Sequence, residues 1–274
     1  NFQDLFAYSR FLPKWQRPYF WLLPRLISRY RRIQAEAAGV LYTSLGMKQW
    51  FGGGARGQVL YPLGESVSNY RSVNASLAGR YKIVYAGNCY GPYGRMILRL
   101  AQCLEGHPKW DFEIYTMGSD WPEEAVEVFK TRGVYCGYLP FPLLRERLGN
   151  AHLLLTAMSF ECEDRVFMET SFTTKVVDYL QFGKPIMVWA PSYSTAARFA
   201  SSTGAALLVE ESNPEKVRES LERFVAEGSL AQALLVAAEK AANGDFNVER
   251  IHGVLKQTFR SVIEPYSAKS VSFS

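Results

Sequence analysis

The chain has 274 residues, of which 48% are hydrophobic and 14% aromatic. That is enough to bury a core in one large or two modest domains, and it argues against an intrinsically disordered protein. The net charge of +5 at pH 7 is concentrated near the start, where residues 1–32 hold seven basic side chains against Asp4 alone. The rest of the chain is nearly neutral, and so narrow a basic segment argues against a nucleic-acid partner.

The residues that could ligate a metal or form disulfides are scattered. The four cysteines and three histidines show no close pairing: Cys89, Cys103, Cys136, Cys162, His107, His152 and His252. We therefore expect no metal site, no disulfide framework and a reducing, cytoplasmic compartment. No apolar run approaches the ~20 residues that a membrane-spanning helix needs. The chain begins at Asn1 without a signal segment, so we expect a fragment or a processed product of a longer protein.

The first 63 residues predict a few short elements followed by a linker. Apolar residues at near-helical spacing predict a helix over 22–38. Short apolar runs then predict a strand at 39–44, a helix at 45–51 and a second strand at 58–62. The stretch 64–80 is rich in Ser, Asn and Gly and only weakly periodic, which is typical of a linker.

From Tyr81 onward the pattern alternates between strands and helices. Strands are predicted at 81–86, 112–117, 134–138, 152–157, 185–189 and 205–209. Helices are predicted at 95–105, 122–131, 141–149, 173–182, 194–202, 213–227, 229–242 and 247–263. Alternation at this spacing predicts an α/β fold: a doubly wound, Rossmann-like parallel sheet with helices on both faces.

A glycine-rich turn follows the first strand of this alternating region. Gly87, Gly91 and Gly94, with Asn88 between them, would let the backbone approach a diphosphate at the start of a helix. Arg95 is a candidate for a second positive contact to that diphosphate. The spacing is not G-x-G-x-x-G and no acidic residue ends the next predicted strand, which argues against a nicotinamide cofactor. A plain strand-to-helix turn explains this segment equally well.

The stretch from Ser171 to Trp189 is the most informative in the chain. Thr173 or Thr174 can cap a helix that carries Lys175 and Asp178 on its solvent face. A helix start with hydroxyls and a lysine suits an anion, and a carboxylate one turn later suits a sugar diol. An ordinary exposed Lys–Asp pair is the alternative.

These segments together resemble GT-B glycosyltransferases, specifically the donor-binding half of the large retaining group (glycosyl transferases group 1, or family 4-like). That group has a run Pro/Ser-x-Lys-x-x-Glu-Tyr-x-x-x-Gly-Lys-Pro-Val. Here the run is Thr174-Lys-Val-Val-Asp178-Tyr179-Leu-Gln-Phe-Gly183-Lys-Pro-Ile186. The resemblance covers roughly residues 30 to 265. It implies a GT-B fold with a truncated first domain: a remnant of the N-terminal acceptor-side domain at 1–63, a linker at 64–80, a donor-binding domain at 81–246, a crossover helix at 247–265 and a tail at 266–274.

The resemblance also implies roles for particular residues. Lys175 and Arg95 would hold the diphosphate, Thr173 and Thr174 would cap it, and Asp178 would accept from the ribose where the family usually has Glu. The turn at 134–141 is similar to the family's Phe-x-Gly-x-x-Pro turn, which points to Tyr138 and Leu139 beside the nucleobase. Many members carry an acidic residue eight positions before the helix carboxylate. Here that position is Thr170, with Glu169 one step away, so the resemblance decides neither the sugar contact nor whether the reaction is retaining or inverting. The acidic segment 160–165 is otherwise expected to be a solvated surface loop.

The expected function is transfer of a sugar, hexosyltransferase-like, from a nucleoside diphosphate sugar to an unknown acceptor without a bound metal or cofactor. Cell-surface polysaccharide or glycoconjugate synthesis is the expected setting. The alternatives are a non-catalytic nucleotide-binding module of the same fold and a nucleotide-sugar epimerase. The basic, aromatic segment 10–32 could contact a membrane surface or a lipid-linked acceptor, although packing on absent structure explains it better.

Overall fold

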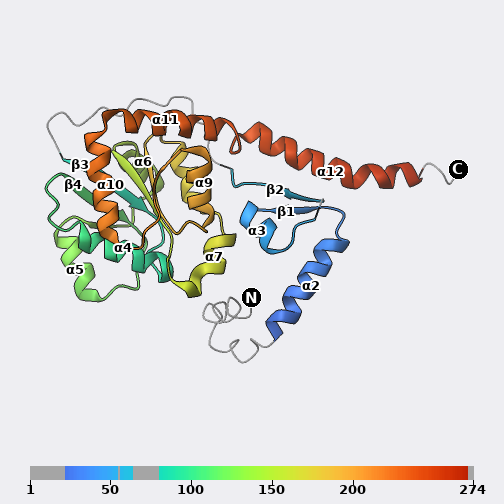
Figure 1. Ribbon diagram of the computed structural model, residues 1–274, viewed down its shortest axis with the longest axis horizontal. Coiled ribbons are helices and arrows are strands. Elements are labelled where there is room, and N and C mark those ends of the chain that lie inside the picture. Colours follow the sequence, from blue (N-terminus) through green and yellow to red (C-terminus); the bar gives the residue numbers. More distant parts are fainter. Residues whose placement is uncertain (1–21, 55, 64–79, 271–274) are drawn as a thin grey trace.

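The structure is a computed structural model that describes residues 22–54, 56–63 and 80–270. Two units are visible in Figure 1: a small first unit and a larger α/β unit, joined at the point where α3 meets α7. The first unit consists of α2 (Leu23–Glu36), β1 (Val40–Tyr42), α3 (Leu45–Trp50) and β2 (Gly57–Val59). Its two strands pair in parallel. The basic, aromatic segment 10–32, for which membrane contact was the less favoured of two interpretations, lies mostly outside the described residues.

The larger unit is built on six parallel strands in the order β5-β4-β3-β6-β7-β8. The strands are β3 (Tyr81–Ala86), β4 (Trp110–Tyr115), β5 (Tyr135–Gly137), β6 (Leu153–Ala157), β7 (Ile186–Trp189) and β8 (Leu207–Val209). Chain order runs outward in both directions from the β3–β6 pair, which is the doubly wound arrangement. The predicted α/β, Rossmann-like fold is therefore confirmed.

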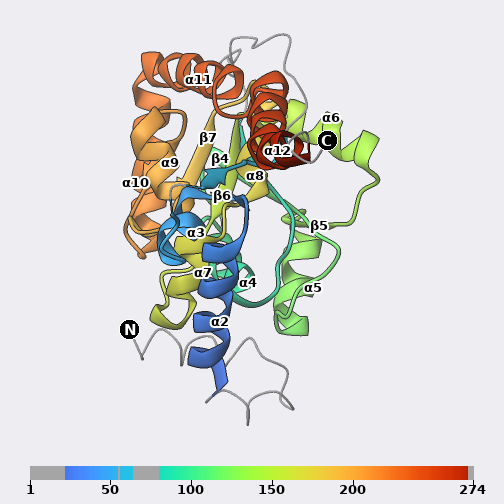
Figure 2. The ribbon, with the colours of Figure 1, turned by 90° about the vertical axis from the view of Figure 1, so that its right-hand side faces the viewer.

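Helices cover both faces of this sheet, which explains why strands such as β6 and β7 are buried along their whole length. The helices that follow β3 in the chain are α4 (Gly91–Cys103), α5 (Glu123–Thr131), α6 (Phe141–Gly149), α7 (Arg165–Thr170), α8 (Thr174–Leu180), α9 (Thr195–Thr203), α10 (Pro214–Ala226), α11 (Gly228–Asn243) and α12 (Val248–Ser270). Of these, α12 runs away from the sheet (Figure 1). Side chains of α4, α5 and α10 pack into the core on one face, and those of α6, α8 and α9 into the core on the other. Figure 2 shows α9 and α10 on the β7 side of the sheet and α5 and α6 on the opposite side, near β5.

Several predicted boundaries differ from the structure, and three of them concern the larger unit and its last helix. The strand predicted at 112–117 spans Trp110–Tyr115, because its pairing with β3 begins at Tyr81 and ends at Ala86. The helix predicted at 95–105 starts at Gly91, one residue before Pro92, which suits a first helical turn. The last helix continues to Ser270, beyond the predicted end at 263 and into the predicted tail.

The two units are held together by contacts between helix ends. Ser44, which caps α3, donates its hydroxyl to the Thr170 carbonyl at the end of α7 over 2.5 Å. A Cβ on Gly46 would lie 1.8 Å from the Glu169 carbonyl oxygen, so only glycine permits this approach. The last helix, α12, runs past the first unit (Figure 1). A Cβ on Gly39 would lie 3.3 Å from the Thr258 methyl group of this helix. Among the described helices, none combines the length and the apolar character needed to cross a membrane.

Candidate functional site

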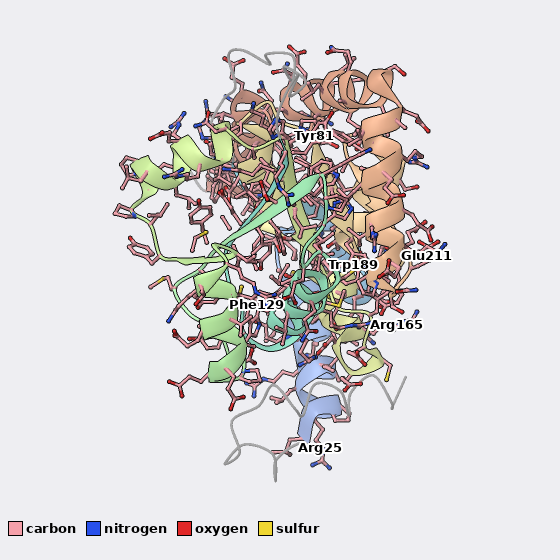
Figure 3. The ribbon with its side chains drawn as sticks, turned by 90° about the vertical axis from the view of Figure 1, so that its left-hand side faces the viewer. Arg25, Tyr81, Phe129, Arg165, Trp189 and Glu211 are labelled. Carbon is pink, nitrogen blue, oxygen red and sulfur yellow. The ribbon has the colours of Figure 1, made fainter. Side chains whose placement is uncertain are left out.

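The central strands separate at their carboxyl ends. The β3–β6 pairing stops at Val84 and Leu154, whereas β3 stays paired with β4 to Ala86 and β6 stays paired with β7 to Ala157. A crevice therefore opens between β3 and β6, where the chain order of the sheet reverses. In open α/β sheets, ligands bind at this point. Figure 3 shows the two ends of the sheet, with Tyr81 at the start of β3 and Trp189, the last residue of β7, nearer Arg165 of α7.

A cavity of about 310 Å³ adjoins the crevice on the β4 side. It is lined by Gly87, Asn88, Tyr90, Tyr115, Thr116, Met117, Gly118, Tyr138, Leu139 and Leu144. Four of these, Gly87, Asn88, Tyr138 and Leu139, are sequence-predicted site residues, so residues from two distant segments meet here. The exposed side chains of Met117 (88%) and Tyr138 (64%) stand at the cavity. Thr116 to Gly118 were missed because the strand was predicted to run to 117, yet their place after a strand was the available signal.

Lys175 lies beside this cavity on α8. Its side chain crosses Gly87 so closely that a Cβ there would lie 2.3 Å from the lysine Cε. The ammonium nitrogen lies 5.2 Å from the ring centroid of Tyr85 and 5.3 Å from that of Tyr93. Within the part of the chain that the structure describes, the ammonium makes no ion pair. Burial lowers the pKa of Lys175 below its ordinary value of 10.5, although Cys89 and Asp178 act in the opposite direction. An unpaired cation of this kind suits an anionic ligand.

The other predicted site residues in and before α8 are Thr173, Thr174 and Asp178. Thr173 is at the N-cap position and buried, but its hydroxyl makes no capping bond, and Thr174 is exposed. With only seven residues, α8 also offers a short dipole. Asp178 is exposed one turn after Lys175. Its pKa is raised by partial burial, which outweighs the opposing effect of Lys175. The ribose role of Asp178 stays a prediction.

The first turn of α4 already binds a carboxylate of this chain, that of Asp120. The Gly91 amide donates to the Asp120 carboxylate over 2.8 Å, and the Tyr90 amide donates to the Asn88 side chain over 2.9 Å. A Cβ on Gly94 would lie 2.1 Å from the Cys89 carbonyl oxygen, so Gly94 is required by packing. These groups serve the turn itself, and a diphosphate would have to compete with Asp120 for the Gly91 amide.

Arg95 faces a carboxylate that the sequence did not associate with it. Its guanidinium donates to Asp164 over 2.8 Å, and the Ser159 hydroxyl donates to the same oxygen over 2.6 Å. Asp164 is 3% exposed and belongs to the short 3-10 turn η2 (Cys162–Asp164), which runs directly into α7. The expectation of a solvated loop over 160–165 is therefore wrong for Asp164. Asp164 is buried because it pairs with Arg95, 69 positions away in the sequence, and no local sequence pattern indicates such a pair.

Asp164 also influences its neighbour Tyr93. Burial, together with the negative charge of Asp164, raises the pKa of Tyr93 to about 12. Thus the crevice has three chemically distinct parts: an apolar cavity on the β4 side, the unpaired Lys175 at Gly87, and the Arg95–Asp164 pair on the β6 side. Among the described residues, no group of three or more His, Cys, Asp or Glu side chains could hold a metal ion.

Comparison with known proteins bears on the fold. No protein-family model and no curated protein matches this chain. Solved structures do match. They include sucrose-phosphate synthase from Thermosynechococcus elongatus (15% identity, TM-score 0.61, 87% of this chain and 62% of that one). AviGT4, a glycosyltransferase involved in avilamycin A biosynthesis, matches with 17% identity and a TM-score of 0.53 over 82% of this chain and 63% of that one. Anabaena Alr3699/HepE in complex with UDP matches with 14% identity and a TM-score of 0.60 over 84% of this chain and 65% of that one.

This chain has a GT-B fold. At 14–17% identity the likeness concerns the fold alone. The chain spans less than two thirds of the length of these GT-B structures, so what they do as whole proteins does not transfer to it directly.

Proposed function

We propose that this chain binds a nucleoside diphosphate sugar and forms the donor side of a glycosyltransferase. The observation that carries the proposal is Lys175, an unpaired and largely buried ammonium beside an apolar cavity at the crevice of the sheet. The cavity suits a nucleobase and the ammonium suits phosphate. The HepE structures, which hold UDP or UDP with glucose, support this choice of ligand.

In this proposal each part of the crevice binds one part of the donor. The base enters the cavity near Tyr138 and Leu139, Asp178 accepts from the ribose hydroxyls, and the diphosphate lies between Gly87 and Lys175. Arg95 can add one contact with a guanidinium N–H that Asp164 does not use. Thr173 and Thr174 stay secondary candidates, because neither hydroxyl caps α8.

The proposed chemistry is electrostatic. The bond between the anomeric carbon and the diphosphate oxygen breaks, and the nucleoside diphosphate keeps the electron pair. The acceptor hydroxyl oxygen bonds to the anomeric carbon, and its proton passes to the departing diphosphate. The Lys175 ammonium stabilises the negative charge that develops on the departing phosphate. We propose no metal for this step. The sugar, the stereochemical outcome and the acceptor, including a lipid-linked one at a membrane surface, belong to the same proposal. The first unit, at 1–63, is proposed as the end of an acceptor-side domain.

Titration calorimetry tests the proposal. UDP, GDP and ADP should be compared with uridine, guanosine and adenosine, and with UDP-glucose and UDP-N-acetylglucosamine. We expect one diphosphate to bind at least tenfold more tightly than its nucleoside, because charge-assisted bonds are worth about 1.5–3 kcal/mol. Equal affinities for each nucleoside and its diphosphate would contradict the proposed function. Incubation with donor alone tests the epimerase alternative, because only an epimerase would form a sugar isomer without an acceptor.

A further inference from the structure

Tyr179 is a buried side chain of α8 whose hydroxyl bonds the backbone of β3. The side chain is 2% exposed, and its hydroxyl bonds both backbone groups of one residue of β3. The Ala86 amide donates to Tyr179 Oη over 2.9 Å, and Oη donates to the Ala86 carbonyl over 3.3 Å. We propose that Tyr179 is a positioning residue that holds the Ala86–Gly87 turn beneath Lys175. The phosphate-related part of this inference rests on the proposed function, whereas its backbone part does not.

The geometry of the sheet explains why a hydroxyl is needed at this place. The Gly87 amide donates to the Tyr115 carbonyl on β4 over 2.9 Å. Because backbone groups of successive strand residues point to opposite sides, the Ala86 amide points toward β6. However, β6 pairs with β3 only as far as Leu154. On the β6 side Ala86 therefore lacks a strand partner, and Tyr179 Oη satisfies backbone groups that would otherwise be unpaired there.

The same helix also holds the next residue of the turn. Tyr179 and Lys175 are four residues apart on α8, so both project from one face toward β3. Tyr179 fixes Ala86, while the Lys175 side chain crosses Gly87. The turn is anchored a third time, because the Tyr85 hydroxyl donates to the Asn88 carbonyl over 2.6 Å.

The consequence is a direct coupling between α8 and the Gly87 side of the crevice, where the diphosphate is proposed to lie. Gly87 and Asn88 line the cavity, and the backbone that leads into them is bonded to Tyr179. Loss of the hydroxyl should free the Ala86 backbone and let Gly87 move relative to the Lys175 ammonium. Diphosphate recognition should then suffer more than recognition of the base, which enters on the β4 side. A tyrosine that only packed in the core would show no such selectivity.

The first experiment needs no ligand. Tyr179→Phe keeps the ring and removes only the hydroxyl. Tyr42→Phe is a matched control, because Tyr42 is 3% exposed and its hydroxyl bonds Gln34 in the first unit over 3.1 Å. Hydrogen exchange of the Ala86 amide should accelerate about tenfold or more in Tyr179→Phe and stay unchanged in Tyr42→Phe. Both variants are measured at a temperature where circular dichroism shows them folded. Unchanged exchange at Ala86 would overturn the proposal.

The second experiment measures binding of UDP and uridine, or of the diphosphate and nucleoside of whichever base binds. Tyr179→Phe should weaken the diphosphate about three- to tenfold and the nucleoside by less than twofold. In a Lys175→Met background the effect on the diphosphate should shrink, because both residues act on one turn. Equal losses for both ligands, or fully additive losses in the double variant, would overturn the positioning role. If the wild-type chain binds no nucleoside diphosphate, the proposed function fails, and the exchange experiment still decides the role of Tyr179 at the backbone.

Discussion

Lys175 brings a positive charge to a place where the described residues offer no ion pair, and its ammonium lies over the rings of Tyr85 and Tyr93. Burying such a charge disfavours folding. Lys175→Met should therefore weaken binding of a nucleoside diphosphate tenfold or more and raise the melting temperature by a few degrees. Calorimetry and thermal unfolding at pH 7 measure the two effects. A variant that loses stability without losing affinity would exclude Lys175 from the site.

The difference in stability between the wild type and Lys175→Met should also depend on pH. The folded chain has a lowered Lys175 pKa, so the unfolded chain binds more protons between that lowered value and 10.5. Stability of the wild type, relative to Lys175→Met, should therefore rise as pH increases through this window. Urea unfolding of both proteins at several pH values between 8 and 10.5 measures it. A wild type that instead lost stability relative to the variant would show that the ammonium has a partner.

Asp178 allows ribose and phosphate recognition to be separated. Asp178→Asn keeps the shape and weakens accepted hydrogen bonds, so affinity for a nucleoside diphosphate should fall while that for inorganic pyrophosphate stays constant. The raised pKa of Asp178 means that acidification protonates it sooner than an ordinary carboxyl. Wild-type affinity should thus fall as the solution is acidified through this pKa, and the asparagine variant should lack that dependence. Equal losses for both ligands would mean damage to α8.

Residues with a local signal were predictable, and those with distant partners were not. Lys175 and Asp178 could be found because one helical turn and one motif define them. Asp164 could not, because its importance comes from Arg95 and Ser159 on other elements. Tyr179 was visible only as part of a motif, since its hydroxyl acts on a strand 93 positions away.

At the scale of elements, the strand–helix alternation was predictable because each strand is an apolar run bounded by turn residues. The helix at 141–149 has its predicted bounds, and the strand at 81–86 does too. The errors arose where tertiary contacts set a boundary. Gly91 and Gly94 were assigned to a phosphate turn, yet both are inside α4, where Asp120 accepts from the Gly91 amide and Gly94 packs against Cys89.

The contact between α3 and α7 yields a prediction about stability. Gly46→Ala would place a methyl group onto the Glu169 carbonyl, so the helices must separate, at about 1–3 kcal/mol. Gly54→Ala is the matched control in the same unit, because nothing lies within 4 Å of its added Cβ. Thermal unfolding of both variants measures the difference. Equal melting temperatures would show that the two units are not held together through this contact.

At the scale of the whole molecule, the two units differ in how completely they are packed. The larger unit has a six-stranded sheet with cores on both faces. The first unit has two strands of three residues each, and Leu26, Tyr30 and Ile33 of α2 are more than half exposed. Parallel sheets are normally covered on both faces, so this unit has the character of a domain edge. The candidate site lies wholly in the larger unit, so we expect this unit to bind a ligand without further structure.

Binding and catalysis should therefore separate in the 274-residue chain. The chain alone should bind a nucleoside diphosphate, because the cavity and Lys175 both belong to the larger unit. It should not transfer sugar at an appreciable rate, because placing an acceptor against the donor needs a second wall, and orientation of reactants is worth about 7–11 kcal/mol. Calorimetry with the diphosphate, together with product analysis after incubation with labelled UDP-glucose and candidate acceptors, measures the two properties on one sample. Lys175→Met serves as the binding-deficient control. Efficient transfer by these residues alone would mean that the first unit, small as it is, already supplies the acceptor site.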